Sequence, residues 1–173
     1  RGRAQPRYRV LGDQIESDFI MTAIFHTPQT DHDIRDEAAE ILIIGAGFAG
    51  LGMGTQLRRH GREDFLIIER ADEVGGTWRD NTYPGAACDV PSHLYSFSFA
   101  MNPHWSGFYT PGPEIQAYIV GVAEREGLYP HIRFNANMEE ARWDQAAERW
   151  IVRTPRGTFT GRYLITGTGH LAD

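Results

Sequence analysis

The chain contains 173 residues with a formal net charge of −6, and its hydrophobic content of 41% is typical of a globular domain. Cys88 is the only cysteine and every basic residue is Arg, which excludes a disulfide framework and a lysine nucleophile. The acidic charge, the lack of metal-ligand spacing among the seven His and the lack of a long apolar run predict a cytoplasmic protein that binds no nucleic acid, metal or membrane.

The first 37 residues differ from the rest of the sequence and are interpreted as a flexible N-terminal tail. Four Arg lie within the first ten residues, but no apolar stretch follows them, so this is not a secretory signal. Met21 precedes a polar, acidic stretch and resembles a natural start, which marks residues 1–20 as upstream or added sequence. A basic interaction arm is the alternative interpretation. Residues 38–173 are then the folded domain.

A strand, a helix and a second strand are expected in the first part of this domain. The apolar run at residues 41–44 predicts a strand that is buried on both faces. Residues 48–60 predict a helix that ends at Gly61, and residues 65–68 predict a second apolar strand. This order is that of a βαβ unit, in which the two strands are parallel.

The rest of the chain predicts an irregular segment, a helix and several strands. Residues 75–113 are rich in Gly, Pro and aromatic residues without a helical period, and an irregular segment of this length usually carries function. A helical pattern follows at residues 113–126. Further strands are expected around residues 132–134, 150–152 and 159–164, with a hairpin turn at 155–157. The expected fold class is α/β: an incomplete Rossmann-type domain with a parallel βαβ sheet and an antiparallel β excursion.

The strand-to-helix turn carries the motif G-x-G-x-x-G, which consists of Gly45, Ala46, Gly47, Phe48, Ala49 and Gly50. In this motif Gly45 permits the tight turn, Gly47 lets the backbone approach a pyrophosphate, and Gly50 lets the helix pack closely on the strand. The start of the helix offers free N–H groups and its positive dipole end to the phosphates. The preceding strand and the following helix favour a dinucleotide site over the alternative of a purely structural glycine turn.

Glu69 ends the second strand at about the spacing of a ribose-binding carboxylate. Its two oxygens can accept hydrogen bonds from both ribose hydroxyls, and its charge would repel a 2′-phosphate, so the turn is expected to bind FAD or NAD rather than NADP. Arg70 is the opposing signal, because an Arg in this region can accommodate a 2′-phosphate. A solvated strand end is the alternative role for Glu69.

Four short motifs in order carry a resemblance to a known family. G-x-G-x-x-G is followed by G-G-T-W at residues 75–78, by Y-P-G-x-x-C-D at 83–89 and by Y-S-F-S-F at 95–99. Over residues 38–173 the sequence resembles the flavin-containing Baeyer–Villiger monooxygenases of the cyclohexanone monooxygenase type. The resemblance implies that residues 45–50 hold the FAD pyrophosphate and that Glu69 binds the adenosine ribose.

The resemblance also implies further cofactor contacts. The ribityl chain and the flavin would lie beside Gly76, Thr77 and Trp78. The adenine would contact Met138, at the end of a strand over residues 133–138. The turn that ends at Gly169 would lead toward the next domain of the family.

Asp89 and Tyr95 would lie beside the isoalloxazine and the nicotinamide, with Asp89 as the candidate catalytic residue. A carboxylate in an aromatic, partly dry pocket stays ionised only if it is paired, and in the family an Arg of the NADPH domain provides the partner. The alternatives are a turn-capping Asp89 and, for Trp78 and Tyr95, ordinary core aromatics.

The resemblance implies the FAD-binding portion of an NADPH-dependent flavin monooxygenase that inserts one oxygen of O₂ into a ketone. Two alternatives stay open: another class B flavin monooxygenase that oxygenates nitrogen or sulfur, and a non-catalytic FAD-binding fragment. Family members often carry Arg where this chain has Ala87, which weakens the assignment to ketone oxidation in particular. The sequence contains no second dinucleotide turn, so this chain alone is expected to lack the NADPH domain, and it indicates neither the particular substrate nor the oligomeric state.

Overall fold

The computed structural model describes residues 36–169. The interpretation of Met21 as a natural start, and nearly all of the predicted tail over residues 1–37, lie outside the described residues. Within them, no helix is both long enough and apolar enough to cross a membrane.

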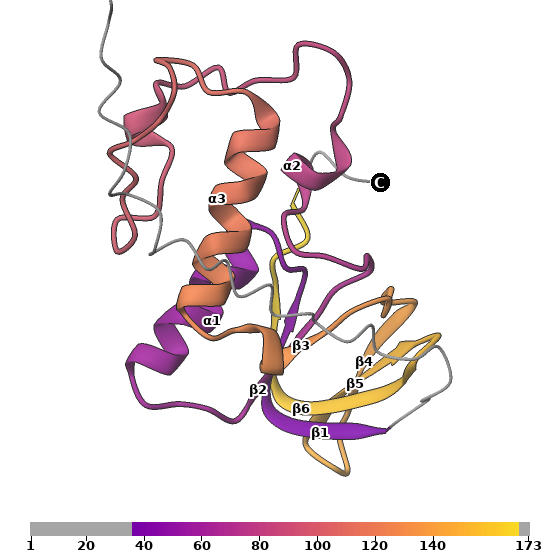
Figure 1. The fold of residues 1–173 in the computed structure, drawn as a ribbon. Coiled ribbons are helices and arrows are strands. Elements are labelled where there is room, and N and C mark those ends of the chain that lie inside the picture. The colour runs from indigo at the N-terminus through magenta and orange to yellow at the C-terminus, as the bar shows by residue number, and fades with distance from the viewer. Residues whose placement is uncertain (1–35, 170–173) are drawn as a thin grey trace, which may run out of the picture. The chain divides into compact units, whose positions relative to one another are not determined.

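Six strands form one sheet in the order β3-β2-β1-β6-β5-β4 (Figure 1). The strands are β1 (Glu37–Ile44), β2 (Phe65–Ile68), β3 (Ile132–Arg133), β4 (Glu140–Asp144), β5 (Arg149–Thr154) and β6 (Gly157–Thr166). The helices are α1 (Phe48–Arg59), α2 (Thr77–Asp80) and α3 (Gly112–Arg125), with the 3₁₀ turns η1 (Ser92–Leu94) and η2 (Tyr129–His131). β1 pairs in parallel with β2 and β6, β2 pairs in parallel with β3, and β4, β5 and β6 are antiparallel. The predicted α/β fold with an antiparallel excursion is confirmed.

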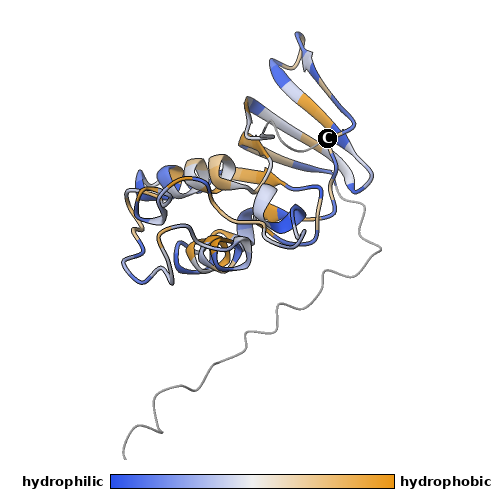
Figure 2. Cartoon of the chain, turned by 90° about the horizontal axis from the view of Figure 1, so that it is seen from above, coloured by the Kyte–Doolittle hydropathy of each residue, from blue (hydrophilic) through white to orange (hydrophobic). Residues whose placement is uncertain are grey.

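Alternate residues of β1 and β2 enter two separate hydrophobic clusters. Ile41 and Ile43 pack with α1 and α3 on one face of the sheet, whereas Leu42 and Ile44 pack with Val152 and Phe159 on the other. Both faces of these strands are therefore buried, as their continuous apolar sequences predict. Figure 2 shows hydrophobic residues between the helices and the sheet and hydrophilic ones gathered at loops and strand ends.

The two long helices match their predicted ranges closely, and a side chain joins them. α1 ends at Arg59, followed by Gly61 in a left-handed conformation, and α3 begins one residue before Pro113. The guanidinium of Arg58 in α1 donates hydrogen bonds to the carbonyl oxygens of Glu126 and Gly127, at 2.9 Å for Gly127. These carbonyls follow the C-terminal end of α3, where a cation is favourable.

β1 begins at Glu37, earlier than the predicted start at residue 41, because β6 pairs along almost its whole length. The register joins Glu37 to Phe159 and Ile44 to Thr166. The Thr158 N–H also donates to the Asp36 carboxylate at 2.9 Å, across 122 positions of the chain. The first and last of the described strands are therefore neighbours at the centre of the sheet.

After α3, one predicted strand was wrong and one observed strand was missed. The strand expected over residues 133–138 is absent, because β3 is two residues long and Met138 lies in the connection to β4. Asn135 has φ 55°, a left-handed conformation that ends the strand. β4 was not predicted: its alternation is limited to Ala141 and Trp143, and none of its five residues is buried.

Candidate functional site

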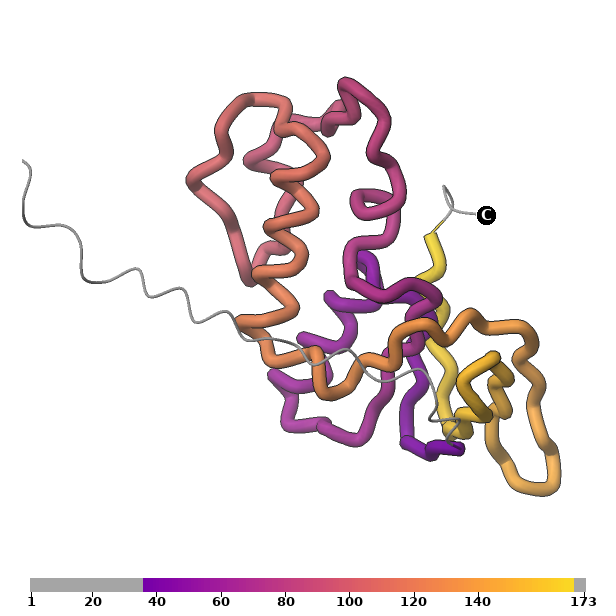
Figure 3. Tube along the Cα trace, turned by 45° about the vertical axis from the view of Figure 1, so that its right-hand side comes forward, coloured from indigo at the N-terminus to yellow at the C-terminus, as the bar shows by residue number. Residues whose placement is uncertain are grey.

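One pocket of about 960 Å³ lies at the carboxyl ends of β1, β2 and β6. This is the edge at which open α/β sheets bind ligands. Two walls enclose the pocket. The glycine wall comprises residues 44–50 and 167–169, and the loop wall comprises residues 75–95; Glu69, Arg70 and residues 136–138 complete the lining. Figure 3 shows the end of β6, in yellow, beside the magenta segment that carries α2.

Backbone atoms of two glycine turns fit closely together in the glycine wall. Gly45 has φ +96°, and a Cβ added there would lie 2.7 Å from the carbonyl oxygen of Gly167. The Gly167 N–H donates to the Ile44 carbonyl oxygen at 2.7 Å. A Cβ on Gly50 would lie 1.8 Å from the Gly45 carbonyl oxygen. Gly45 and Gly50 are therefore required by the fold itself, in the roles that the motif predicts.

Gly47 differs from its two neighbours because the fold does not require it. Its backbone is extended, with φ −84°, and an added Cβ would make only an ordinary contact of 3.7 Å with Gly76. Gly47 is the N-cap of α1, where no side chain forms a capping hydrogen bond and the first turn holds no acidic residue. The N–H groups at this helix end therefore face the pocket ready for an anionic ligand.

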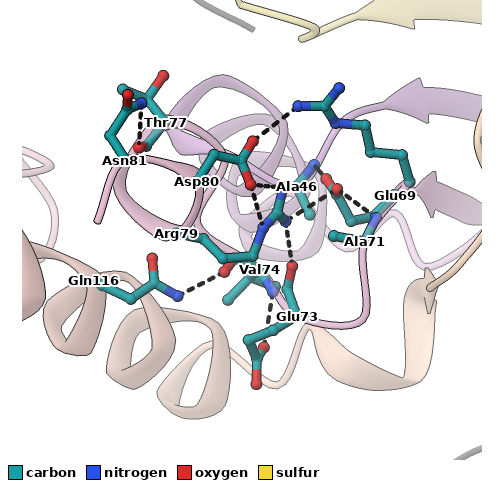
Figure 4. Close-up of polar contacts among 11 residues, drawn as sticks. Ala46, Glu69, Ala71, Glu73, Val74, Thr77, Arg79, Asp80, Asn81 and Gln116 are labelled. Carbon is teal, nitrogen blue, oxygen red and sulfur yellow. Dashed lines mark hydrogen bonds and ion pairs between the residues drawn. The ribbon is translucent and has the colours of Figure 1, made fainter. Parts of the chain in front are cut away.

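Glu69 follows β2, and only 3% of its surface is exposed (Figure 4). Its Oε2 accepts a hydrogen bond from the Ala46 N–H at 2.7 Å. Its Oε1 accepts one from the Ala71 N–H at 2.9 Å and one from Nη1 of Arg79 at 3.0 Å. The sequence predicted Glu69 at the pocket but not its pairing with Arg79, which depends on the path of the chain between the two residues.

Two Arg and two carboxylates alternate at this end of the pocket. Arg79 bonds Oδ1 of Asp80 through Nε at 2.9 Å, and Arg70 bonds Oδ2 of the same carboxylate at 2.8 Å. Burial opposes ionisation of Asp80, but the hydrogen bonds from Arg70 and Arg79 outweigh it and lower the pKa of Asp80 below its usual value. The side chain of Arg70, considered above for a 2′-phosphate, is thus engaged with Asp80.

Aromatic side chains form the part of the pocket beyond α2. The Trp78 indole N–H donates to the Tyr95 hydroxyl at 3.0 Å, and the Tyr95 ring meets Phe48 edge-on with centroids 5.1 Å apart. Burial raises the pKa of Tyr95, and the nearby Cys88 and Asp89 raise it further, so Tyr95 is a neutral phenol at pH 7. Trp78 and Tyr95 pack against the core and also line the pocket, and their contact with a flavin stays a prediction.

Asp89 lies on the loop wall with an exposed side chain that faces the pocket. No Arg pairs with it among residues 36–169, and its carboxylate forms no turn-capping hydrogen bond there. Its negative charge is therefore presented to the pocket.

Most residues predicted for the site line this one pocket. They are Gly45, Gly47, Phe48, Ala49, Glu69, Arg70, Gly76, Thr77, Trp78, Asp89, Tyr95, Met138 and Gly169. Ala46 and Gly50 lie outside the lining: Ala46 acts through its N–H on Glu69, and Gly50 acts in packing. Arg79, Asn137 and Thr168 were missed, and their only sequence signal is their position beside predicted residues.

These features fit a dinucleotide. Within residues 36–169, no group of three or more His, Cys, Asp or Glu could hold a metal ion. A parallel βαβ unit combines an open glycine position, an uncapped helix start and a strand-end carboxylate around one pocket. Together they define a dinucleotide-binding domain of the Rossmann type.

The comparisons with known proteins agree with a dinucleotide-binding domain of the Rossmann type and relate it to monooxygenases. The family model for an NAD(P)-binding Rossmann-like domain matches residues 43–111. A Baeyer–Villiger monooxygenase of Streptomyces coelicolor is 49% identical over 143 residues, which cover 83% of this chain and 28% of that protein. An FAD-binding monooxygenase of Botryotinia fuckeliana is 46% identical over 122 residues, which cover 69% of this chain and 23% of that protein.

Solved structures of monooxygenases share the fold. A steroid monooxygenase bound to NADP superposes with a TM-score of 0.71 at 40% identity, covering 76% of this chain and 26% of that one. A cyclohexanone monooxygenase from Rhodococcus sp. Phi1 bound to NADP⁺ superposes with a TM-score of 0.75 at 31% identity. The match covers 80% of this chain and 27% of that one. The chain is homologous to the Baeyer–Villiger monooxygenases, and it spans about a quarter of the length of these relatives.

Proposed function

We propose that this chain is the FAD-binding part of an NADPH-dependent flavin monooxygenase that inserts one oxygen of O₂ into a ketone. The observation that carries the proposal is the pocket, in which Gly47, the start of α1 and Glu69 meet the G-G-T-W and Y-P-G-x-x-C-D segments. Relatives named Baeyer–Villiger monooxygenase and FAD-binding monooxygenase, and the NADP-bound structures, support this cofactor pair and reaction.

In this proposal the residues of the glycine wall and Glu69 bind the adenosine diphosphate half of FAD. The N–H groups at the start of α1 donate to the pyrophosphate, which approaches the backbone at Gly47. Glu69 accepts from the adenosine ribose, and Met138 borders the adenine. The loop wall then receives the flavin, with Trp78 and Tyr95 beside it.

FAD, when bound, supplies the redox chemistry that no side chain of this chain can supply, namely hydride acceptance from NADPH and the activation of O₂. The protein binds and orients the cofactor and excludes water from it. Phe48, Trp78 and Tyr95 give the flavin end of the pocket an apolar wall that keeps water away. Asp89 places a carboxylate at the same end, where it would hold a cationic group of the rest of the enzyme against the reacting atoms.

The test of FAD binding is Gly47→Val in the 173-residue chain, titrated with FAD and followed by the visible spectrum and flavin fluorescence. Because the backbone at Gly47 is extended and unobstructed, we expect the variant to fold and to bind FAD at least about tenfold more weakly, since its side chain occupies the pyrophosphate position.

Gly107→Ala is a suitable glycine control outside the pocket. A Cβ there would meet its nearest neighbour at the same 3.7 Å, so its FAD affinity should equal that of the unchanged chain. If Gly47→Val binds FAD as tightly as the control, the site assignment is wrong.

The reaction itself is tested in the entire enzyme. Consumption of NADPH with formation of an ester or lactone from a ketone is the expected result. Turnover with amines or sulfides and none with ketones would contradict the proposed substrate class while leaving FAD binding intact.

A further inference from the structure

The Glu69 carboxylate has little acceptor capacity left for a ligand. An ionised carboxylate offers about four lone-pair positions, two on each oxygen. Both positions of Oε1 are used, by the Ala71 N–H and by Arg79. Among residues 36–169, Oε2 accepts from the Ala46 N–H alone, which leaves one of its positions for a ligand.

Arg79 is fixed where it contacts Glu69, and only 14% of its side chain is exposed. Its Nε and Nη2 bond Oδ1 of Asp80 at 2.9 and 2.8 Å, and its Nη1 also donates to the Glu73 carbonyl oxygen. The planar guanidinium fork therefore spans three acceptors in one orientation.

The segment around Glu73 and Val74, which supplies one of these acceptors, is itself held by hydrogen bonds (Figure 4). The Glu73 carboxylate accepts from the Val74 N–H at 2.8 Å and from the Tyr129 hydroxyl at 2.7 Å. Gln116 of α3 donates to the Val74 carbonyl oxygen at 2.7 Å. The position of Arg79, and with it the orientation of Glu69, is thus set by contacts that reach α3.

We propose that Arg79 is a specificity-determining positioning residue of the pocket: by occupying Oε1 of Glu69, it restricts this carboxylate to a single hydrogen bond with the ligand ribose, at Oε2. The inference rests on the dinucleotide pocket of the proposed function. It replaces the expectation from the sequence that both oxygens of Glu69 accept from the two ribose hydroxyls.

The test uses FAD and two FAD analogues that lack either the 2′- or the 3′-hydroxyl of the adenosine ribose, titrated into the 173-residue chain. We expect one analogue to bind about tenfold more weakly than FAD, the equivalent of one charge-assisted hydrogen bond, and the other to bind within about twofold of FAD. Similar losses with both analogues, or no loss with either, would overturn the inference. Failure of the unchanged chain to bind FAD at all would instead contradict the proposed function.

Arg79→Met extends the test, because Met has similar length and no donor. Release of Oε1 should let Glu69 accept from both hydroxyls, so that both analogues then bind several-fold more weakly than FAD. A merely structural Arg79 would change the affinity for FAD and both analogues by one common factor, and that result would overturn the inference.

Arg153→Ala is the charge-matched control, because Arg153 pairs with Glu140 in the exposed hairpin and lies outside the pocket. It should reproduce the pattern of the unchanged chain. If Arg79→Met does not fold, the titration of the unchanged chain with the two analogues still decides the question.

Discussion

At Gly50, on the glycine wall, one added methyl group would lie 1.8 Å from a backbone carbonyl oxygen; at Gly85, on the loop wall, it would meet nothing within 4 Å. The glycine wall is held by backbone atoms in close contact around Gly45 and Gly167. The loop wall is held by side chains, through the Trp78–Tyr95 hydrogen bond and the contacts of Arg79.

This difference separates two ways of shaping one pocket. Where backbone atoms touch, as at Gly45 and Gly50, the glycine wall is insensitive to the loss of any one side chain but does not accept an added atom. The loop wall has open space at Gly85 but not at Gly75, where an added Cβ would lie 1.9 Å from Oε1 of Gln116. It weakens whenever one hydrogen-bond donor or acceptor is lost. The pocket therefore has a fixed shape along the glycine wall, and its shape along the loop wall depends on particular polar contacts.

The largest effect is expected from Gly50→Ala. The added methyl group overlaps the Gly45 carbonyl, so α1 must move away from the strand, and the free energy of unfolding should fall by about 3 kcal/mol. Chemical denaturation followed by circular dichroism measures this change. Gly47→Ala, three residues earlier, is the matched control and should stay within about 0.5 kcal/mol of the unchanged chain. Equal stability of the two variants would contradict the claim that the close backbone contact at Gly50 fixes the glycine wall.

A smaller effect is expected from Ser92→Ala, which lies where the loop wall meets the segment leading to α3. The Ser92 hydroxyl contacts the Thr110 hydroxyl at 2.6 Å and accepts from the Thr110 N–H at 2.9 Å, and Ser92 is buried. Removal of the Ser92 hydroxyl leaves the buried Thr110 N–H without this acceptor, so the free energy of unfolding should fall by about 2 kcal/mol.

Ser98→Ala provides the comparison for Ser92→Ala, because Ser98 is exposed and should tolerate the change within about 0.5 kcal/mol. A neutral Ser92→Ala would show that this contact does not hold the segment.

The smallest effect concerns pH and Asp80. Its pKa is lower in the folded chain than in the unfolded chain, so its ion pairs add stability above the unfolded value of about 3.9, and this contribution is lost as pH falls through the folded pKa. Asp80→Asn should therefore unfold with a weaker dependence on pH below about pH 4 than the unchanged chain. Superimposable acid unfolding curves for the two proteins would contradict the role of Arg70 and Arg79 at this carboxylate.

The sequence predicts the glycine wall better than the loop wall for a physical reason. Apolar runs, helix-ending glycines and the G-x-G-x-x-G spacing are local signals, and they place α1, β2 and the end of β1 close to their observed limits. Gly45 and Gly50 meet each other within six residues of sequence, so their packing can be inferred from the motif alone.

The loop wall depends on contacts between residues whose approach no local pattern specifies. The Arg79 pairing requires the chain to turn back over ten residues, and the Ser92–Thr110 contact spans eighteen. The premature end of β3 has the same origin: only Ile67 and Ile68 of β2 are paired with it, and the left-handed Asn135 then turns the chain away. The site residues on this wall were found through the family resemblance, not through periodicity.

The central position of β6 has a consequence for synthesis on the ribosome. β1 can pair with β2 soon after both have emerged, but its other edge has no partner until β6 is made, roughly 120 residues later. At about 5–20 residues per second, that interval lasts on the order of ten seconds. Throughout it, a strand that is apolar on both faces presents an open edge to other chains, the situation in which strands aggregate. This part of the nascent chain is thus most vulnerable between the completion of its βαβ unit and the arrival of β6.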